Sequence, residues 1–126
     1  LACALAVPVG GMASAVLTVN NVRDLETDRH AGKRTMAVRL GLARARWWYL
    51  AQIFTGYAVV ALLIHRDALP MHAALVLLSL PAAAKVTNVV ARREDGPALN
   101  AALGATAKLQ ALFALLLLPA LLFPGR

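Results

Sequence analysis

Apolar residues in this 126-residue chain are gathered into four long runs, which shorter polar stretches separate. The runs cover about residues 1–19, 47–64, 69–90 and 98–123. A helix needs about 20 predominantly apolar residues to cross the hydrocarbon core of a bilayer, and each run is near that length. The pattern therefore predicts an all-α protein, a polytopic bundle of four transmembrane helices.

Composition favours a membrane protein over a nucleic-acid-binding one. Hydrophobic residues make up 60% of the chain and charged residues only 15%, although the net charge is +7. A strongly basic chain often binds nucleic acid. Here, however, the basic residues lie beside apolar runs and are mixed with acidic ones, which membrane orientation explains better. We therefore expect the lipid bilayer as a partner, and no nucleic acid.

The distribution of basic residues predicts how the helices are oriented. Seven of the thirteen Lys and Arg residues lie between Arg23 and Arg46, and two more arginines lie in the 91–97 connection. Cytoplasmic connections carry an excess of Lys and Arg in membrane proteins. We therefore expect the 20–46 loop and the 91–97 connection in the cytoplasm, in a multi-pass protein of the inner (plasma) membrane.

Candidate chemistry follows the first apolar run. If that run continues as a helix beyond Val19, then Asn20, Asp24 and Asp28 recur every four residues and line one face. Two carboxylates one turn apart repel each other unless a cation lies close to them. Mg²⁺ typically takes one or two protein carboxylates and completes its shell with water and substrate phosphate. The spacing thus predicts Asp24 and Asp28 as Mg²⁺ ligands, whereas Glu26 points away.

Basic residues come directly after these carboxylates. Gly32 is expected to end the helix, and the following arm carries Lys33, Arg34 and Arg39. A bound diphosphate needs a metal on some oxygens and Lys or Arg on the others. The combination favours a phosphorylated, lipid-soluble substrate that is met at the membrane surface.

The polar stretch contains a longer motif. It reads Asn20-Asn21-Val22-Arg23-Asp24, then Asp28, then Gly32-Lys33, and closes with Thr35-Met36-Ala37-Val38-Arg39-Leu40-Gly41. This motif resembles the second aspartate-rich motif of the UbiA superfamily of intramembrane prenyltransferases. Its opening and close are most similar to the 1,4-dihydroxy-2-naphthoate polyprenyltransferases of menaquinone synthesis, and residues 98–113 resemble the last helix of that branch.

The resemblance implies an architecture and an activity. Members of this family have nine transmembrane helices and two aspartate-rich motifs that face each other near the cytoplasmic side. Residues 1–126 would then be the carboxy-terminal part of one prenyltransferase domain, with the last four helices. Its partners would be the missing amino-terminal half, a polyprenyl diphosphate and an aromatic acceptor, with Mg²⁺ as cofactor. We expect 1,4-dihydroxy-2-naphthoate as the acceptor, and we expect the fragment alone to be inactive.

The resemblance also implies roles for individual residues. The residues expected to act on the diphosphate are Asn20, Asn21, Arg23, Asp24, Asp28, Lys33 and Arg39. Of these, Asp24, Asp28 and Lys33 are the expected catalytic residues. Lys33 and the other four are expected to bind substrate, through positive charge or amide hydrogen bonds.

Polar residues inside the predicted spans are further candidates. Lys108 lies about ten residues into the fourth span, on a face that it shares with Asn100. It either binds substrate in the cavity or extends its ammonium to the interface along its aliphatic stem. Lys85, Asn88 and Arg92 form a stripe at the end of the third span, for which interface anchoring is favoured over lining the cavity mouth.

Two other classes of protein remain open. A cation-coupled transporter would use the carboxylates to bind its coupling ion, and would place ionisable groups near the bilayer midplane. A structural four-helix scaffold would carry an ordinary basic loop. Within the prenyltransferase class, a benzoquinone precursor or a tetrapyrrole is an alternative acceptor.

Overall fold

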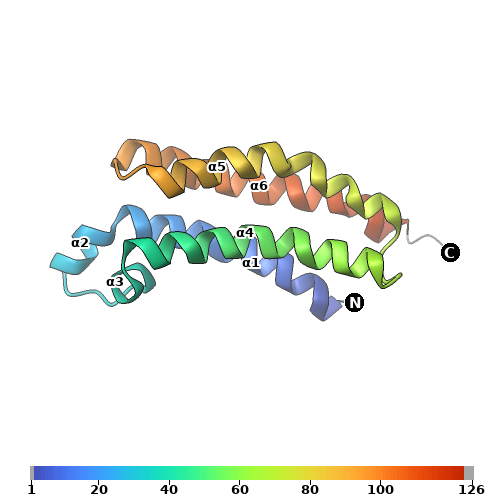
Figure 1. Cartoon of the computed structure of the whole chain (residues 1–126), viewed down its shortest axis with the longest axis horizontal. Coiled ribbons are helices and arrows are strands. Elements are labelled where there is room, and N and C mark those ends of the chain that lie inside the picture. The colour runs from blue at the N-terminus through green and yellow to red at the C-terminus, as the bar shows by residue number, and fades with distance from the viewer. Residues whose placement is uncertain (1, 124–126) are drawn as a thin grey trace.

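The computed structural model describes residues 2–123, which form helices and connections without a strand. The elements are α1 (Ala2–Arg23), α2 (Leu25–His30), α3 (Met36–Leu40), α4 (Leu42–His65), the 3₁₀ segment η1 (Met71–Ser79), α5 (Leu80–Arg92) and α6 (Gly96–Leu122). Within this part of the chain, four helical stretches are long and apolar enough to cross a membrane: Cys3–Arg23, Leu42–His65, Met71–Arg92 and Gly96–Leu122. The predicted all-α bundle with four spans is confirmed (Figure 1).

The 20–46 segment, expected to be a connecting loop that opens with a helix ending at Gly32, is mostly helical. It contains the end of α1, both short helices α2 and α3, and the start of α4 at Leu42 rather than at Trp47. Hydropathy locates the boundary of the apolar core, but a helix continues past that boundary while its residues favour helix. Arg and Ala are good helix formers, and arginine side chains keep their charged ends in water along their aliphatic stems.

The third span begins as a 3₁₀ helix and becomes α-helical beside Pro81. Pro81 is near the start of α5, where its missing N–H is harmless. Its ring would clash with the carbonyl four residues earlier, which disfavours a regular α-helix immediately before it. The chain has the tighter 3₁₀ form over Met71–Ser79 and is α-helical from Leu80.

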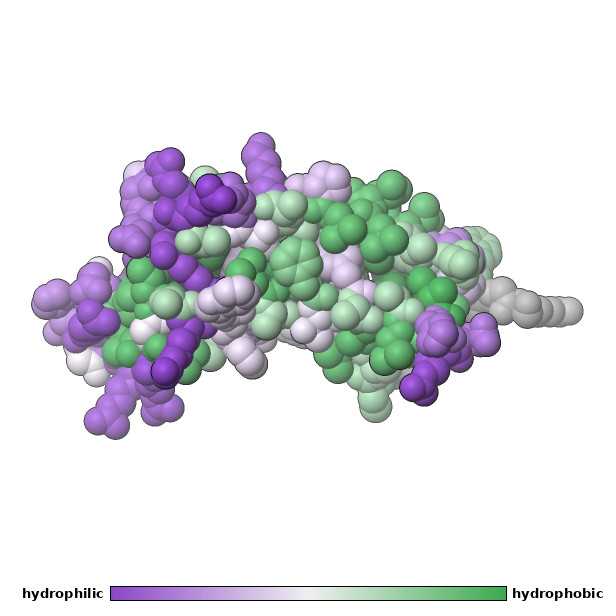
Figure 2. All heavy atoms as spheres, viewed as in Figure 1, coloured by the Kyte–Doolittle hydropathy of each residue, from purple (hydrophilic) through white to green (hydrophobic). Residues whose placement is uncertain are grey.

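The four spans pack as two neighbouring pairs. Helix α1 packs against α4 and α6, and α6 also packs against η1 and α5. Figure 1 shows α2 and α3 at one end of the bundle, where α5 also turns into α6; we call this the motif end. Figure 2 shows hydrophilic residues gathered over the motif end, with a second, smaller group near the connection from α4 to η1. On the face seen in Figure 2, the surface between them is largely hydrophobic, as expected for a membrane-spanning bundle.

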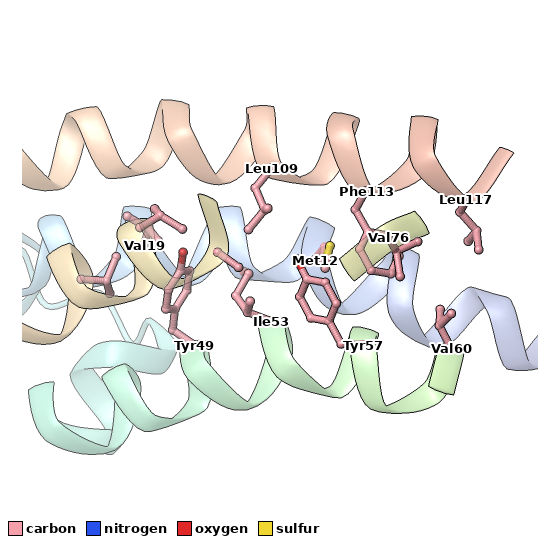
Figure 3. Close-up of a cluster of buried hydrophobic side chains, with 14 of the residues drawn as sticks. Met12, Val19, Tyr49, Ile53, Tyr57, Val60, Val76, Leu109, Phe113 and Leu117 are labelled. Carbon is pink, nitrogen blue, oxygen red and sulfur yellow. The ribbon is translucent and has the colours of Figure 1, made fainter. Parts of the chain in front are cut away.

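A continuous apolar core joins the spans (Figure 3). Its larger side chains are Met12 and Val19 from α1, Tyr49, Ile53, Tyr57 and Val60 from α4, Val76 from η1, and Leu109, Phe113 and Leu117 from α6. The rings of Tyr57 and Phe113 meet edge to face, with centroids 5.2 Å apart and an interplanar angle of 86°. This is a favoured geometry for two aromatic rings, and it fixes α4 against α6.

Buried polar side chains are bonded across helices. In the part of the chain that the structure describes, three buried side-chain pairs bond across helices: Thr18–Gln52 at 2.8 Å, Tyr49–Thr106 at 2.9 Å and Tyr57–Ser79 at 2.7 Å. Within hydrocarbon, a polar group needs a protein partner because water is absent. These bonds therefore help to fix which turn of each helix meets which turn of its neighbour.

A second buried cluster holds the short helices at the motif end. It consists of Val22, Leu25, Ala37, Ala45 and Leu99, which come from α1, α2, α3, α4 and α6 respectively. Helices of six and five residues are too short to be stable by themselves. Their apolar residues in this cluster anchor them to the bundle, and so position the motif that they carry.

Candidate functional site

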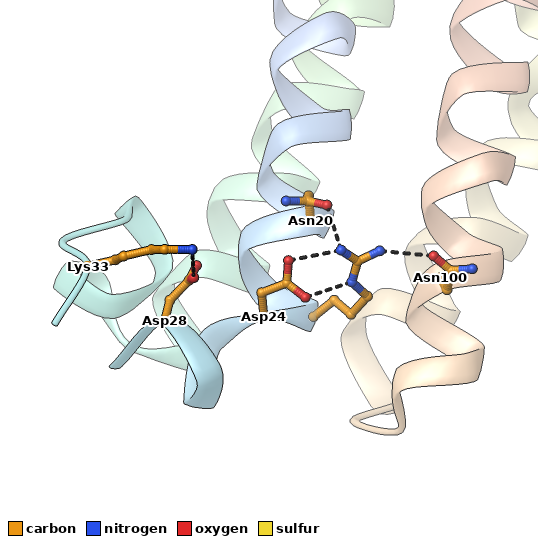
Figure 4. Close-up of polar contacts among 6 residues, drawn as sticks. Asn20, Asp24, Asp28, Lys33 and Asn100 are labelled. Atoms are coloured by element: carbon orange, nitrogen blue, oxygen red, sulfur yellow. Dashed lines mark hydrogen bonds and ion pairs between the residues drawn. The ribbon is translucent and has the colours of Figure 1, made fainter. Parts of the chain in front are cut away.

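The predicted site lies where α1 gives way to α2 (Figure 4). The helix is interrupted at Asp24, which has φ −93° and ψ 8°. The hydrogen-bond pattern nevertheless continues across the interruption. The N–H of Asp24 donates to the carbonyl of Asn20 at 3.0 Å, and the N–H of Asp28 donates to the carbonyl of Asp24 at 2.8 Å. The three residues thus follow one another at helical spacing, with a local break between the two helices.

Arg23 engages both carboxylate oxygens of Asp24. Its Nε donates to Oδ1 at 2.8 Å and its Nη2 donates to Oδ2 at 2.9 Å. This hydrogen bonding, together with the charges of Arg23 and Lys33, holds the pKa of the Asp24 carboxyl below its usual range, although partial burial opposes the effect. Asp24 is therefore ionised and already neutralised by an internal cation.

The same guanidinium bridges two helices. Nη2 of Arg23 also donates to Oδ1 of Asn20 at 2.9 Å, and Nη1 donates to Oδ1 of Asn100 at 2.9 Å. Asn100 belongs to the first turns of α6, 77 residues further along the chain. The guanidinium thus bonds to an amide group on each of the two helices, Asn20 and Asn100 (Figure 4, dashed lines).

Asp28 has a different basic partner. Its side chain is 8% exposed, and Oδ1 lies 3.1 Å from Nζ of the largely exposed Lys33. The turn that ends α2 creates this pair. The N–H of Gly32 donates to the carbonyl of Arg29 at 3.2 Å, and the N–H of Lys33 donates to that of Asp28 at 2.9 Å. This is a Schellman arrangement, with Gly32 at φ 69°. The predicted helix end at Gly32 is confirmed.

The donor set fits part of a Mg²⁺ site. Two carboxylates are as many as Mg²⁺ usually takes from a protein, with water and phosphate oxygens completing the octahedron. Across residues 2–123 no group of three or more His, Cys, Asp or Glu side chains could hold a metal ion by itself. Glu26 lies outside the set, since its carboxylate pairs with Arg29 at 2.9 Å on the exposed side of α2. Asp24 and Asp28 would therefore supply a share of a metal's ligands, not all of them.

Among the described residues, the other predicted ones form no ion pair with Asp24 or Asp28. Asn21 is half-buried near the end of α1, and Arg39 is exposed in α3. Arg34 is exposed in the connection between α2 and α3. Among the described residues, Asp24 and Asp28 form their ion pairs with Arg23 and Lys33 and not with these arginines.

Comparison with known proteins identifies the family. Residues 1–112 match the UbiA prenyltransferase family. The chain belongs to that family. The motif over residues 20–41 had indicated this membership, which the match now confirms.

Relatives of this UbiA-family chain carry related names. It is 34% identical over 122 residues to 1,4-dihydroxy-2-naphthoate octaprenyltransferase of Mycobacterium leprae, covering 96% of the chain and 40% of that protein. It is 34% identical over 99 residues to the Escherichia coli protein of the same name, covering 79% of the chain and 32% of that protein. It is also 37% identical over 78 residues to UbiA prenyltransferase domain-containing protein 1 of Xenopus tropicalis, covering 62% of the chain and 22% of that protein. The chain thus spans well under half the length of these curated relatives. No solved structure matches it.

Lys108 of the UbiA-family chain lies in a groove between α5 and α6. The groove has a volume of about 460 Å³ and walls of mostly Ala, Val and Leu side chains. Lys85 and Lys108 are its two charged lining residues. The structure thus places in one groove two lysines that were treated separately in the sequence analysis. Within residues 2–123, neither lysine forms an ion pair with Asp24 or Asp28.

Asn100 is the polar contact of the motif that sequence reasoning missed. The sequence placed it only on a helix face shared with Lys108. One signal was available, because Asn100 is a polar residue one turn into an otherwise apolar helix. Its bond to Arg23 could not be inferred, since that bond depends on how α6 packs against α1.

Proposed function

We propose that the protein to which this chain belongs transfers a polyprenyl group from a polyprenyl diphosphate to an aromatic acceptor. The observation that carries the proposal is the pairing at the motif end, where two carboxylates one turn apart each have a basic residue within 3.1 Å. Such a set can hold a metal and offer cations to the same diphosphate. Family membership and the names of the M. leprae and E. coli relatives support the same activity.

For the acceptor we propose 1,4-dihydroxy-2-naphthoate, in menaquinone synthesis. Both bacterial relatives are named for that substrate. In the reaction, the allylic C–O bond breaks and its electron pair leaves with pyrophosphate. The ring carbon that bears the carboxylate bonds to the allylic carbon, and the carboxylate departs as CO₂, so that its bonding electrons restore the aromatic ring.

Each residue of the motif end has a part in this proposal. Asp24 and Asp28 would hold Mg²⁺, which when bound offsets the charge that develops on the leaving pyrophosphate. Lys33 and Arg39 would hold diphosphate oxygens by charge-assisted hydrogen bonds. The amides of Asn20 and Asn21 have N–H donors for the remaining oxygens.

The bilayer and the rest of the protein complete the site. The apolar spans would enclose the prenyl chain and exclude water, which otherwise captures the allylic cation. We propose that the motif end faces the cytoplasm in the inner (plasma) membrane, because basic residues concentrate there. We further propose that the amino-terminal part of the protein supplies the remaining metal ligands, so that residues 1–126 alone are inactive.

The test is a pyrophosphate-release assay on the full-length protein in lipid nanodiscs, with Mg²⁺, a polyprenyl diphosphate and a panel of aromatic acid, benzoquinone-precursor and tetrapyrrole acceptors. We expect 1,4-dihydroxy-2-naphthoate to be prenylated. Asp24→Asn and Asp28→Asn should each lower kcat by roughly 100-fold or more, because each removes an electrostatic contribution to the transition state. Glu26→Gln is the matched control on the same helix and should keep its activity.

The same assay separates the alternatives. Retained activity in both aspartate variants would contradict the site assignment. Prenylation of a different acceptor would change the substrate alone. A cation-coupled transporter is disfavoured because Asp24 and Asp28 lie beyond the end of the first span and not near its middle. Cation-dependent uptake without prenyl transfer would restore that interpretation.

A further inference from the structure

We propose that Arg23 is an exchangeable counter-ion, which neutralises Asp24 in the ligand-free protein and turns to an anionic diphosphate when Asp24 is engaged by a divalent cation. Asn100 is its positioning residue. The inference rests on the proposed function, and concerns the order in which the site accepts its ligands.

The two carboxylates of the motif are occupied unequally. Arg23 donates to both oxygens of Asp24, at 2.8 and 2.9 Å. Lys33 contacts Asp28 through Oδ1, at 3.1 Å. Within residues 2–123, no hydrogen bond or ion pair of the structure involves the other side-chain oxygen of Asp28. Asp28 can therefore accept a cation and keep Lys33, whereas Asp24 cannot do so without loosening its bidentate pair.

Charge and geometry give the displaced guanidinium a new partner. A divalent ion bound to Asp24 would offset the negative charge that holds Arg23. The ion's own positive charge would also repel the guanidinium. Arginine presents a planar fork of N–H donors that fits the oxygens of a phosphate as well as those of a carboxylate. Diphosphate oxygens bound beside the same cation thus replace the carboxylate as acceptors. Binding of cation and diphosphate is then coupled through Arg23.

Asn100 limits where the guanidinium can go. Its Oδ1 accepts from Nη1 of Arg23 at 2.9 Å, while Oδ1 of Asn20 accepts from Nη2 on the other side. Both acceptors are neutral amides, so they direct the guanidinium without adding charge. A small rotation can then release Asp24 while Nη1 stays on Asn100, which keeps the cation at the motif end.

The test measures binding, separately from catalysis, on the full-length protein in nanodiscs. Isothermal titration calorimetry is carried out with Mg²⁺ alone, with inorganic pyrophosphate alone, and with Mg²⁺ in the presence of pyrophosphate. For the wild type we expect pyrophosphate to tighten Mg²⁺ binding. Arg23→Gln should bind Mg²⁺ alone about fivefold more tightly, because Asp24 is freed from a part-exposed ion pair. Pyrophosphate should then tighten Mg²⁺ binding less in Arg23→Gln than in the wild type, because the coupling through Arg23 is lost.

Two variants guard against a general loss of charge or of folding. Arg29→Gln removes a cation from the same segment, but one that pairs with Glu26. It should leave Mg²⁺ binding unchanged. Arg23→Lys keeps the positive charge but cannot donate two parallel hydrogen bonds to the carboxylate. Its Mg²⁺ affinity should therefore lie between those of the wild type and Arg23→Gln. Thermal unfolding of each variant checks that the bundle is intact.

The positioning role of Asn100 has its own signature. Asn100→Ala should raise the KM for polyprenyl diphosphate and leave kcat within about twofold, since the reacting groups are unchanged. Asn100→Ser retains an acceptor oxygen and should recover part of the loss. A change in kcat at constant KM would contradict this role.

The exchange is overturned if Arg23→Gln and Arg29→Gln bind Mg²⁺ alone with the same affinity. If the affinities are equal but the wild type prenylates its acceptor, the proposed function stands and only the counter-ion exchange of Arg23 is contradicted. If the wild type binds neither Mg²⁺ nor pyrophosphate, the exchange fails together with the proposed function.

Discussion

Lys33 is joined to Asp28 twice, by its main-chain N–H to the Asp28 carbonyl at 2.9 Å and by its Nζ to the carboxylate at 3.1 Å. The first bond belongs to the turn that ends α2, and it brings the second within reach. The turn depends on Gly32, whose φ of 69° is a conformation that L side chains rarely adopt. A backbone feature thus determines which cation Asp28 receives.

Substitution of Gly32 should destabilise this turn in proportion to the cost of positive φ. We expect Gly32→Ala to lower the free energy of unfolding by about 1 kcal/mol. Gly32→Asn should cost less, because Asn tolerates the left-handed region better. Thermal unfolding of the full-length protein in detergent measures the effect. Equal stability of the Ala and Asn variants would show that the turn does not require positive φ.

The hydrogen bond between Tyr49 and Thr106 should make a measurable contribution to stability. Thr106 donates its proton to the carbonyl of Ala102 at 2.7 Å, so the Tyr49 hydroxyl is the donor in the 2.9 Å bond to Thr106. We expect a coupling energy of about 0.6 kcal/mol, typical of hydrogen bonds between membrane helices. The measurement is a double-mutant cycle of Tyr49→Phe and Thr106→Val in unfolding experiments. Strict additivity of the two substitutions would contradict the bond.

Asp95 should make stability depend on pH in a defined direction. It caps α6 by accepting from the N–H of Ala98 at 3.1 Å, and it accepts from Nε of Arg93 at 2.6 Å. The hydrogen bond from Arg93 is the main cause that lowers the pKa of the Asp95 carboxyl. Because the pKa is lower in the folded than in the unfolded protein, the ionised carboxylate stabilises the folded state at pH values above its ordinary pKa of about 3.9. This contribution is lost as the pH falls below that value and through the folded pKa.

Asp95→Asn separates the charge from the cap, because Asn is an equally good capping residue. Near neutral pH we expect Asp95→Asn to melt at a lower temperature than the wild type. In acid the two melting temperatures should converge, because the wild type has then lost its ion pair. Melting temperatures are recorded from about pH 6 down to about pH 2. A constant difference between the two proteins across that range would show that the Arg93 pair adds nothing.

Lys108 should affect the acceptor and not the diphosphate. It lies eight residues beyond Asn100 in α6, which is about 12 Å further along the helix axis. It lines a groove with apolar walls, where an ammonium group favours an anionic partner such as the carboxylate of an aromatic acid. Lys108→Met should raise the KM for the acceptor about fivefold, with the KM for polyprenyl diphosphate unchanged.

Lys85 provides the matched control, since it lines the same groove and belongs to the stripe for which interface anchoring is favoured. Lys85→Met should leave both KM values unchanged. If Lys108→Met also changes neither, then Lys108 only extends its charge to the membrane interface.

Local features of the sequence were enough for the four spans, the family and the spacing of the two aspartates. Hydropathy depends on composition within about 20 residues, and the motif lies within residues 20–41. The end of α2 was also predictable, because a glycine after a helical stretch indicates a left-handed C-terminal residue. Helix α3 was not predictable, because a helix of five residues owes its stability to packing partners that are distant in the sequence, such as Leu99.

Only the tertiary structure decided which partner each charged group has. Arg23 was expected to act on a diphosphate, but the bundle places its guanidinium on Asp24, Asn20 and Asn100. Lys85 and Lys108 were separate candidates until α5 packed against α6 and made them line one groove. The sequence determines which chemical groups are present and how they are spaced along one helix. Contacts over 77 residues depend on how whole helices pack, and the sequence pattern of a single helix carries no information about its neighbour.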